Sequence, residues 1–192
     1  GAGKYSANLL LNPNLDTGWS KTYNEDIQWN RIDPPDGVVV NGGRDEIGSG
    51  SNVVGFIDCT NEASGCYVWK GNASTESLND GRGYWTSYGD YALMEPDVEY
   101  EASVFVKVSA SSVQIRCYTA DNTEKLNEGW RVWSPYESVA SADGWTRVSW
   151  AFTNVGDVQS LSFHWKGLVD ARMWLSAPAL KRKGDETCIS CP

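Results

Sequence analysis

The chain has 192 residues and a formal net charge of −9 at pH 7, from 25 Asp and Glu against 16 Lys and Arg. This charge argues against nucleic acid as a ligand, because an acidic chain repels a phosphate backbone. No run approaches the roughly 18 apolar residues of a membrane helix, and the single histidine excludes a metal site built on several imidazoles.

Turn residues divide much of the chain into short segments. Apolar runs at residues 37–40, 53–57 and 66–70 predict strands, because each run is bounded by glycine, asparagine, aspartate or proline. Residues 72–91 and 120–143 are instead rich in glycine, serine, asparagine and aromatic residues. We expect these two stretches to be long loops, and loops of this length in a compact domain usually carry function.

Five further segments alternate apolar and polar residues with the period of two that indicates a half-buried strand. They cover residues 98–108, 112–118, 145–153, 161–166 and 172–180. In each segment the apolar set is expected to face the core. The expected core residues are Tyr100, Ala102, Val104, Val106, Val108, Val113, Ile115, Cys117, Val148, Trp150, Phe152, Leu161, Phe163, Trp165, Met173, Leu175, Ala177 and Ala179.

The strand pattern also predicts the fold class. No segment gives convincing evidence of a helix, and many short strands separated by turn residues indicate an all-β protein. We therefore predict an antiparallel two-sheet β-sandwich, a jelly roll, formed by residues 8–183, with residues 184–192 as a C-terminal tail. This length suffices for one compact domain with its own core, so no second domain is required.

The five cysteines leave at least one thiol that is free or paired between chains. Cys117 lies in an alternating segment and is expected in the core. Cys59 and Cys66 bracket a turn-rich segment that a disulfide would close in an oxidising compartment. Cys188 and Cys191 have the spacing of a zinc or redox motif but lack a second ligand pair and a strand-to-helix context. We expect them to be incidental residues of the tail.

Ten tryptophans and nine tyrosines are more large rings than a single small β domain buries. Some of them are therefore expected to face a ligand. Rings stack on the C–H faces of sugars, on nucleobases and on quaternary amines, and the acidic net charge removes nucleic acids from this set. A neutral glycan is the favoured ligand.

Strand parity gives candidate ligand-binding residues. Positions that alternate with core positions point outward, and we expect them to share one face. An amide, a guanidinium, an imidazole and rings on that face suit the hydroxyls and C–H faces of a sugar. The two predicted loops add further rings. For each residue, the alternative that its side chain merely covers a sheet face beneath a loop stays open. The candidates are Gln114, Arg116, Tyr118, His164, Arg172 and Trp174 from strands, and Tyr84, Trp85, Tyr88, Trp130 and Trp133 from the loops.

Several motifs resemble the jelly-roll carbohydrate-binding modules of families 4, 9 and 22, in the galactose-binding-like superfamily. The first is Asn8-Leu-Leu-Leu-Asn12 with Asn14-Leu-Asp16 and Gly18-Trp19; the next are Pro96-Asp-Val-Glu-Tyr100 and Gly144-Trp145-Thr-Arg-Val148. The segment from Met173 to Leu180 is similar to the closing strand of that family. The resemblance implies a module that binds polysaccharide without catalysis, as an ancillary part of a larger secreted or cell-surface enzyme or adhesin.

The same pattern occurs in bacteriophage tail proteins, and residues 180–187 resemble the sequence that follows the closing strand there. The alternative is therefore a structural or receptor-binding module of a virion or cell surface, expected to form oligomers. A polysaccharide lyase or hydrolase on the same fold is a further alternative, because the many acidic residues leave carboxylate pairs open. Its test is product release from a polysaccharide.

No cofactor is expected. Modules of the resembled family often hold a structural calcium ion, but the closing strand of this chain has no acidic residue. Asp16 alone cannot supply the six to eight oxygen ligands of a calcium site, so calcium is not favoured. The expected partner is a polysaccharide or oligosaccharide, with no nucleic acid and no membrane insertion.

Overall fold

The computed structural model describes the backbone of residues 5–6, 9–10, 19–21, 25–26, 28–32, 35–36, 41–42, 50–51, 53–60, 69–70, 77–78, 83–87, 94–120, 132–154 and 160–187. Side chains are described for residues 9–10, 32, 35–36, 54–60, 94–119, 134–154 and 161–185. The predicted strand at residues 37–40 lies outside these ranges.

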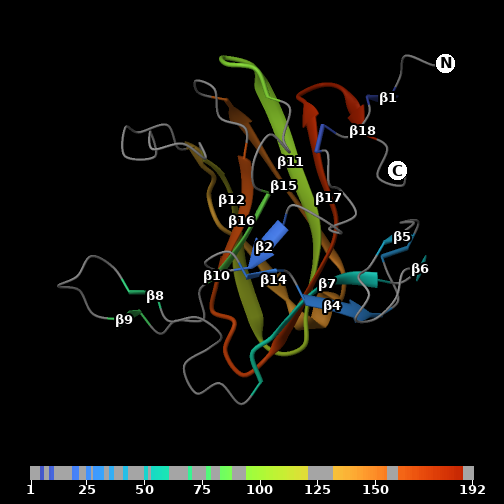
Figure 1. Cartoon of the computed structure of the whole chain (residues 1–192), viewed down its shortest axis with the longest axis vertical. Helices are drawn as coiled ribbons and strands as arrows, with labels where there is room; N and C mark the ends of the chain where they lie inside the picture. The colour runs from blue at the N-terminus through green and yellow to red at the C-terminus, as the bar shows by residue number, and fades with distance from the viewer. Residues whose placement is uncertain are drawn as a thin grey trace.

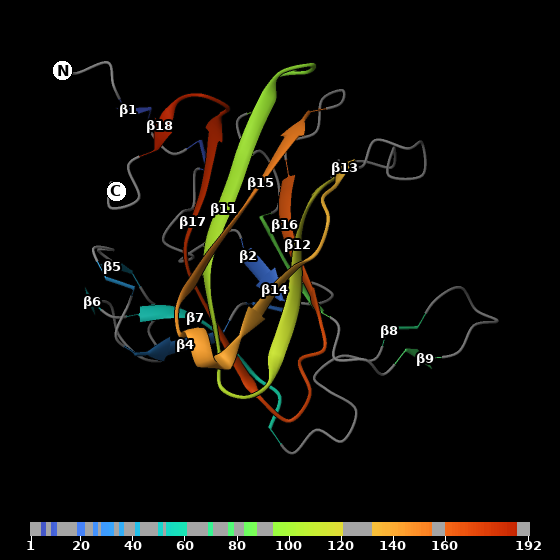
Figure 2. The same cartoon turned by 180° about the vertical axis from the view of Figure 1, so that it is seen from behind.

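Two large antiparallel sheets form the protein (Figure 1, Figure 2). The five-stranded sheet has the order β15 (Thr146–Thr153), β11 (Glu99–Val108), β17 (Arg172–Arg182), β7 (Val53–Asp58) and β4 (Gln28–Arg31). The seven-stranded sheet has the order β13 (Val132–Trp133), β12 (Ser112–Ala120), β16 (Ser160–Lys166), β10 (Gly83–Ser87), β2 (Trp19–Lys21) and β3 (Glu25–Asp26), with β14 (Glu137–Ala140) also paired to β12.

Smaller elements complete the described part of the chain. Two hairpin-like pairs join β5 (Asn41–Gly42) to β6 (Gly50–Ser51) and β8 (Trp69–Lys70) to β9 (Ser77–Leu78). A short 3-10 helix, η2, covers Ser141–Asp143. None of the helices in the described ranges has the length and apolarity of a membrane span. The predicted all-β, antiparallel two-sheet sandwich is confirmed.

The chain ends pair with each other. Strand β1 (Tyr5–Ser6) runs parallel to β18 (Glu186–Thr187), which follows β17 directly (Figure 1). The pair joins residues that flank the predicted domain, 8–183, and it gives part of the predicted tail a regular structure.

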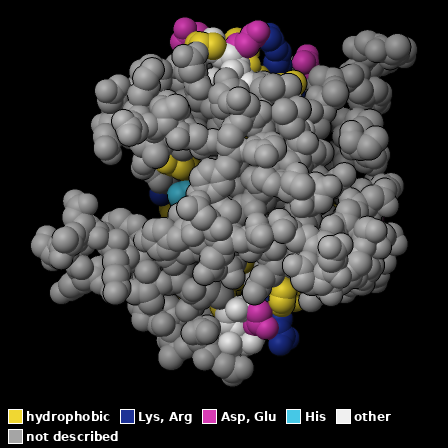
Figure 3. Space-filling model, viewed as in Figure 1, with side chains coloured by type: hydrophobic (Ala, Val, Ile, Leu, Met, Phe, Trp, Pro, Cys, Tyr) yellow, Lys and Arg dark blue, Asp and Glu magenta, His cyan; other side chains and the backbone are white. Residues whose placement is uncertain are grey.

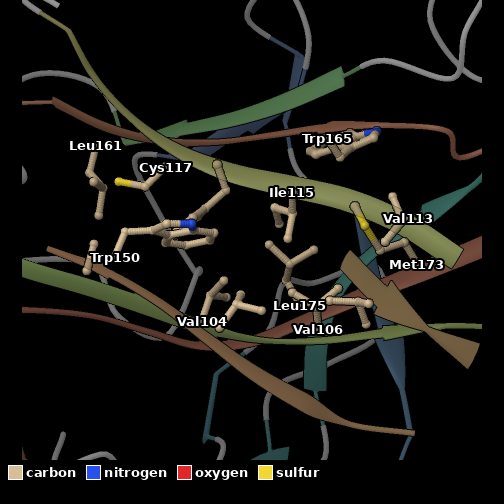
Figure 4. Close-up of a cluster of buried hydrophobic side chains, with 14 of the residues drawn as sticks. Val104, Val106, Val113, Ile115, Cys117, Trp150, Leu161, Trp165, Met173 and Leu175 are labelled. Atoms are coloured by element: carbon tan, nitrogen blue, oxygen red, sulfur yellow. The ribbon is translucent and has the colours of Figure 1, made fainter. Parts of the chain in front are cut away.

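The core lies between the two sheets, and alternation builds it from both sides. On β11 the predicted inward set from Tyr100 to Val108 is buried, and Val113, Ile115 and Cys117 of β12 face it (Figure 4). Trp150 of β15 packs against Phe163 of β16 with ring centroids 6.0 Å apart. The core positions predicted from the period of two are thus correct for β11, β12, β15 and β16.

A β-bulge changes the pattern on β17. Ser103 of β11 pairs with Ala179, but Phe105 pairs with Ser176, so β17 has one extra residue at this point. Ala177 in the bulge has φ 49°, and beyond it the in–out parity reverses. Leu180 therefore belongs to the core. Ala177 and Ala179 were predicted to share the core face of Met173. Ala179 is buried but pairs with Ser103 rather than with a core residue, Ala177 is only partly buried, and neither belongs to the core cluster.

The two stretches predicted as long loops contain strands. Residues 72–91 include β9 and β10, and residues 120–143 include β13, β14 and η2. These strands have two to five residues, too few for a period of two to be recognised in the sequence. Pairing with strands distant in the sequence can form such a strand without a local pattern. β10, for example, pairs with both β16 and β2.

The cysteines differ in state. Cys59 is disulfide-bonded, whereas Cys117 is free and buried. The partner of Cys59 is therefore Cys66, Cys188 or Cys191, all of which lie outside the described residues, and the predicted bond to Cys66 stays a prediction. Burial raises the pKa of the Cys117 thiol, which keeps it protonated and unreactive.

Ala177→Gly is expected to raise the free energy of unfolding by up to about 1 kcal/mol, because glycine removes the strain of a Cβ at positive φ. Ala102→Gly is the matched control, because Ala102 is fully buried in a regular part of β11. We expect this variant to have a free energy of unfolding lower by about 1 kcal/mol or more. Urea denaturation of both variants measures the two changes. If Ala177→Gly lost as much stability as Ala102→Gly, the bulge geometry would be contradicted.

Non-reducing peptide mapping should find Cys59 in a cross-linked peptide, with Cys66 as the expected partner. Iodoacetamide should label Cys117 only after unfolding in denaturant, because the buried thiol is shielded and protonated. The labelled peptides are identified by mass spectrometry with and without denaturant. Rapid labelling of Cys117 in the native protein would contradict its burial.

Candidate functional site

The outer faces of the two sheets lie on opposite sides of the sandwich, and each carries polar and aromatic side chains. Residues paired across antiparallel strands share a face. Gln114 pairs with Lys166 and Arg116 with His164, so β12 and β16 present one common surface. We call it the seven-stranded face, made up of Gln114, Arg116, Tyr118, Tyr136, His164 and Lys166. The five-stranded face comprises Phe56, Asp58, Phe105, Lys107, Arg172 and Trp174.

The sequence-based candidates are thus divided between two surfaces. Gln114, Arg116, Tyr118 and His164 lie together on the seven-stranded face, whereas Arg172 and Trp174 belong to β17 on the opposite side. The expectation that all of them share one face is wrong. Strand parity says whether a residue points toward the core, but it does not say to which sheet the strand belongs.

Trp174 and Arg172 have partners on the five-stranded face. The Trp174 ring stacks on Phe56 with centroids 5.9 Å apart, and the Lys107 ammonium lies 5.9 Å from the indole centroid. The Arg172 guanidinium is 3.4 Å from the Asp58 carboxylate. Hydrogen bonds from the Thr60 hydroxyl and backbone N–H, with Arg172 as a lesser cause, lower the pKa of Asp58.

Tyr136 is the aromatic centre of the seven-stranded face. The Arg116 guanidinium carbon lies 4.5 Å from the Tyr136 ring centroid, and the Lys166 ammonium lies 4.3 Å from it. Both distances are within cation–π range. Tyr136 and Lys166 were not among the sequence candidates, because only the tertiary contact connects them. The one feature of the sequence that pointed to Tyr136 was the aromatic content of residues 120–143.

Hydrogen bonds hold the segment that carries Tyr136. The Ser134 backbone N–H donates to the Cys117 carbonyl at 3.0 Å, and the Cys117 N–H donates to the Ser134 hydroxyl oxygen at 2.8 Å. The Trp150 indole N–H, from the opposite sheet, donates to the Pro135 carbonyl at 3.1 Å. Ser134 is thus bonded to β12, and Pro135 is bonded to Trp150 of the core. Tyr136 follows these two residues directly.

Tyr118 and His164 form the neighbouring part of this face. Their rings meet edge to face, with centroids 4.6 Å apart. Tyr118 is only 7 % exposed, so its ring supports His164 and offers little surface of its own. Figure 3 shows the single histidine, in cyan, beside hydrophobic and basic side chains. Gln114 is exposed at the other end of the face.

The remaining candidates are placed only through their backbone or not at all. Tyr84 pairs in register with His164 and Trp133 with Tyr118, which puts both positions on the seven-stranded face. Trp85 pairs with the core residue Phe163, so its position is on the inner side of the sheet. Tyr88 and Trp130 lie outside the described residues.

The described side chains include no group of three His, Cys, Asp or Glu residues that would hold a metal ion. Asp16, the one calcium candidate, lies outside the described ranges. The seven-stranded face offers hydrogen-bond donors and rings: a guanidinium and an ammonium at Tyr136, and an amide and an imidazole on the same two strands.

No family model and no curated protein match the chain. Among solved structures, 95 % of the chain is similar to the CBM22-1 and GH10 modules of Clostridium thermocellum endo-1,4-beta-D-xylanase 10B, complexed with xylohexaose, at 16 % identity and a TM-score of 0.52. The chain spans 29 % of that xylanase chain.

Two further structures are similar. The CBM22-1 xylan-binding domain of Paenibacillus barcinonensis Xyn10C matches 95 % of this chain and 99 % of its own, at 10 % identity and a TM-score of 0.48. Tailspike protein 4 of bacteriophage CBA120 matches 91 % of this chain and 21 % of its own, at 8 % identity and a TM-score of 0.48. The chain has the jelly-roll β-sandwich fold that carbohydrate-binding modules share.

Trp150→Phe should keep the ring packed against Phe163 but lose the indole hydrogen bond to Pro135. We expect a loss of about 1 kcal/mol in the free energy of unfolding and faster amide exchange at Tyr136. Trp174→Phe is the control, because its indole nitrogen has no hydrogen-bond partner in the described part of the chain. Denaturation and hydrogen exchange measure both variants. Equal effects would contradict an anchoring role for Trp150.

Proposed function

We propose that this chain is a non-catalytic module that binds polysaccharide through the seven-stranded face. The observation that carries the proposal is the fixed arrangement of Arg116 and Lys166 around Tyr136 on one sheet face. The fold supports it, since structures of the same fold include the modules complexed with xylohexaose and a xylan-binding domain.

The face offers what a sugar polymer requires. Glycan hydroxyls need fixed donors and acceptors, and the exposed Gln114 amide, Arg116 and His164 supply them along adjacent strands. Tyr84 and Trp133 occupy positions on the same face, from strands beside β16 and β12.

The role of such a module is to hold a larger protein on its glycan. We therefore propose that the chain is an ancillary part of a secreted or cell-surface protein, or of a virion if the parent is a phage protein. A structural or receptor-binding role in a phage tail is the second class of function. Stable trimers without glycan affinity, seen by light scattering, would favour that role.

Tyr136→Ala should weaken polysaccharide binding at least about tenfold, which is about 1.4 kcal/mol, because it releases the ends of Arg116 and Lys166. Tyr136→Phe keeps the ring and should bind normally. Ligands are first identified on a glycan array with plant, bacterial and host polysaccharides, and affinity gel electrophoresis then measures each variant.

Trp174→Ala is the control on the opposite face and is expected to bind normally. Circular dichroism establishes that each variant is folded. If Trp174→Ala loses binding and Tyr136→Ala retains it, the site is on the five-stranded face. If no polysaccharide on the array binds the wild-type chain, the binding function itself is wrong.

A further inference from the structure

Charge is distributed unevenly between the two sheets. Strands β13, β12, β16, β10 and β2, which follow one another in the seven-stranded sheet, contain no aspartate or glutamate. Their neighbours at the edges do: Glu137 in β14 pairs with the inward residue Ile115, and β3 at the other edge contains Glu25 and Asp26. The centre of this sheet is thus free of acidic residues in a chain with a net charge of −9.

Ion pairs show the same division. Each of the five ion pairs that join two described residues belongs to the five-stranded sheet or to the turns beside it. Arg147 and Lys181 both approach Glu101, and Arg172 approaches Asp58. Arg182 pairs with Glu95 and Lys183 with Glu99. The basic residues of the five-stranded sheet are therefore largely neutralised by carboxylates of the same sheet.

Lys166 is in a different situation. Within the described part of the chain, its ammonium group contacts the Tyr136 ring and forms no ion pair with a carboxylate. Arg116 contacts the same ring, so two positive charges are held close together. Like charges repel, and an anion bound beside both would offset that repulsion.

We propose that the ligand is an acidic polysaccharide, whose carboxylate or sulfate groups bind Lys166 and Arg116. This inference rests on the proposed function and specifies the ligand class of the same site. The Tyr136 ring attracts both cations through its quadrupole and limits the positions of their flexible side chains. An anionic oxygen then meets donors that are already in place, and the adjacent Gln114 amide binds sugar hydroxyls.

The acidic net charge led to the expectation of a neutral glycan, but net charge does not decide a local contact. At about 0.1 M salt, charges more than about 10 Å apart across solvent are largely screened. Glu95, Glu99, Glu101 and Asp58 belong to the opposite sheet or its adjoining turns. For an anionic group at Lys166, direct contact with the ammonium therefore outweighs these four carboxylates of the opposite side.

Isothermal titration calorimetry of the full chain against matched polymers tests the ligand class. The pairs are polygalacturonate and glucuronoxylan, each with its carboxyl-reduced form, and dextran sulfate with unsulfated dextran. We expect the acidic member of a pair to bind at least about tenfold more tightly, and more weakly as NaCl rises from about 0.05 M to about 0.5 M. The carboxylate and sulfate pairs distinguish the two kinds of anion.

Lys166→Gln should weaken binding of the acidic polymer by about fivefold and weaken binding of its neutral partner by a smaller factor. Lys107→Gln is the matched control, because Lys107 also lies over a ring but on the opposite face. Equal affinity for acidic and neutral members, or tighter binding of the neutral ones, would overturn the inference and leave the binding function intact. If none of the six polymers bound, the result would count against both the acidic ligand class and the proposed polysaccharide-binding function.

Discussion

The burial of two apolar sheet faces against each other is the constraint on which the rest of this structure depends. Each long strand has one apolar side, and only a second sheet can remove that side from water. Once β11 and β12 face each other across the core, their polar residues must lie on opposite surfaces of the molecule. Two chemically different outer faces follow directly from this single core.

Trp150 connects the core to the candidate site. Its ring packs on Phe163 inside the sandwich, and its indole N–H holds the Pro135 carbonyl at the edge of the other sheet. Tyr136 follows immediately, so the position of the site's central ring depends on core packing. This arrangement favours a preformed surface, in which little conformational entropy is lost when a ligand binds.

Electrostatics distinguishes the two faces. On the five-stranded sheet, carboxylates such as Glu101 and Asp58 lie beside the basic residues, and the surface is nearly balanced. On the seven-stranded face, Lys166 and Arg116 share an aromatic ring instead. A ring attracts a cation without neutralising it, so the charge of Lys166, which forms no ion pair within the described residues, remains available to a ligand. An acidic chain can therefore keep one locally basic surface.

The sequence by itself determined the all-β class, the two-sheet sandwich and most of the core, because a period of two records which side of a strand is buried. It also predicted that Gln114, Arg116, Tyr118 and His164 point outward, since β12 and β16 are both long and regular, but the pairing that makes them neighbours came from the tertiary structure. Only the tertiary structure decided that Trp174 belongs to the other sheet, that the bulge at Ala177 reverses the parity of β17, and that Tyr136 meets Arg116 and Lys166. These features depend on which distant strands pair, and local periodicity carries no information about that pairing.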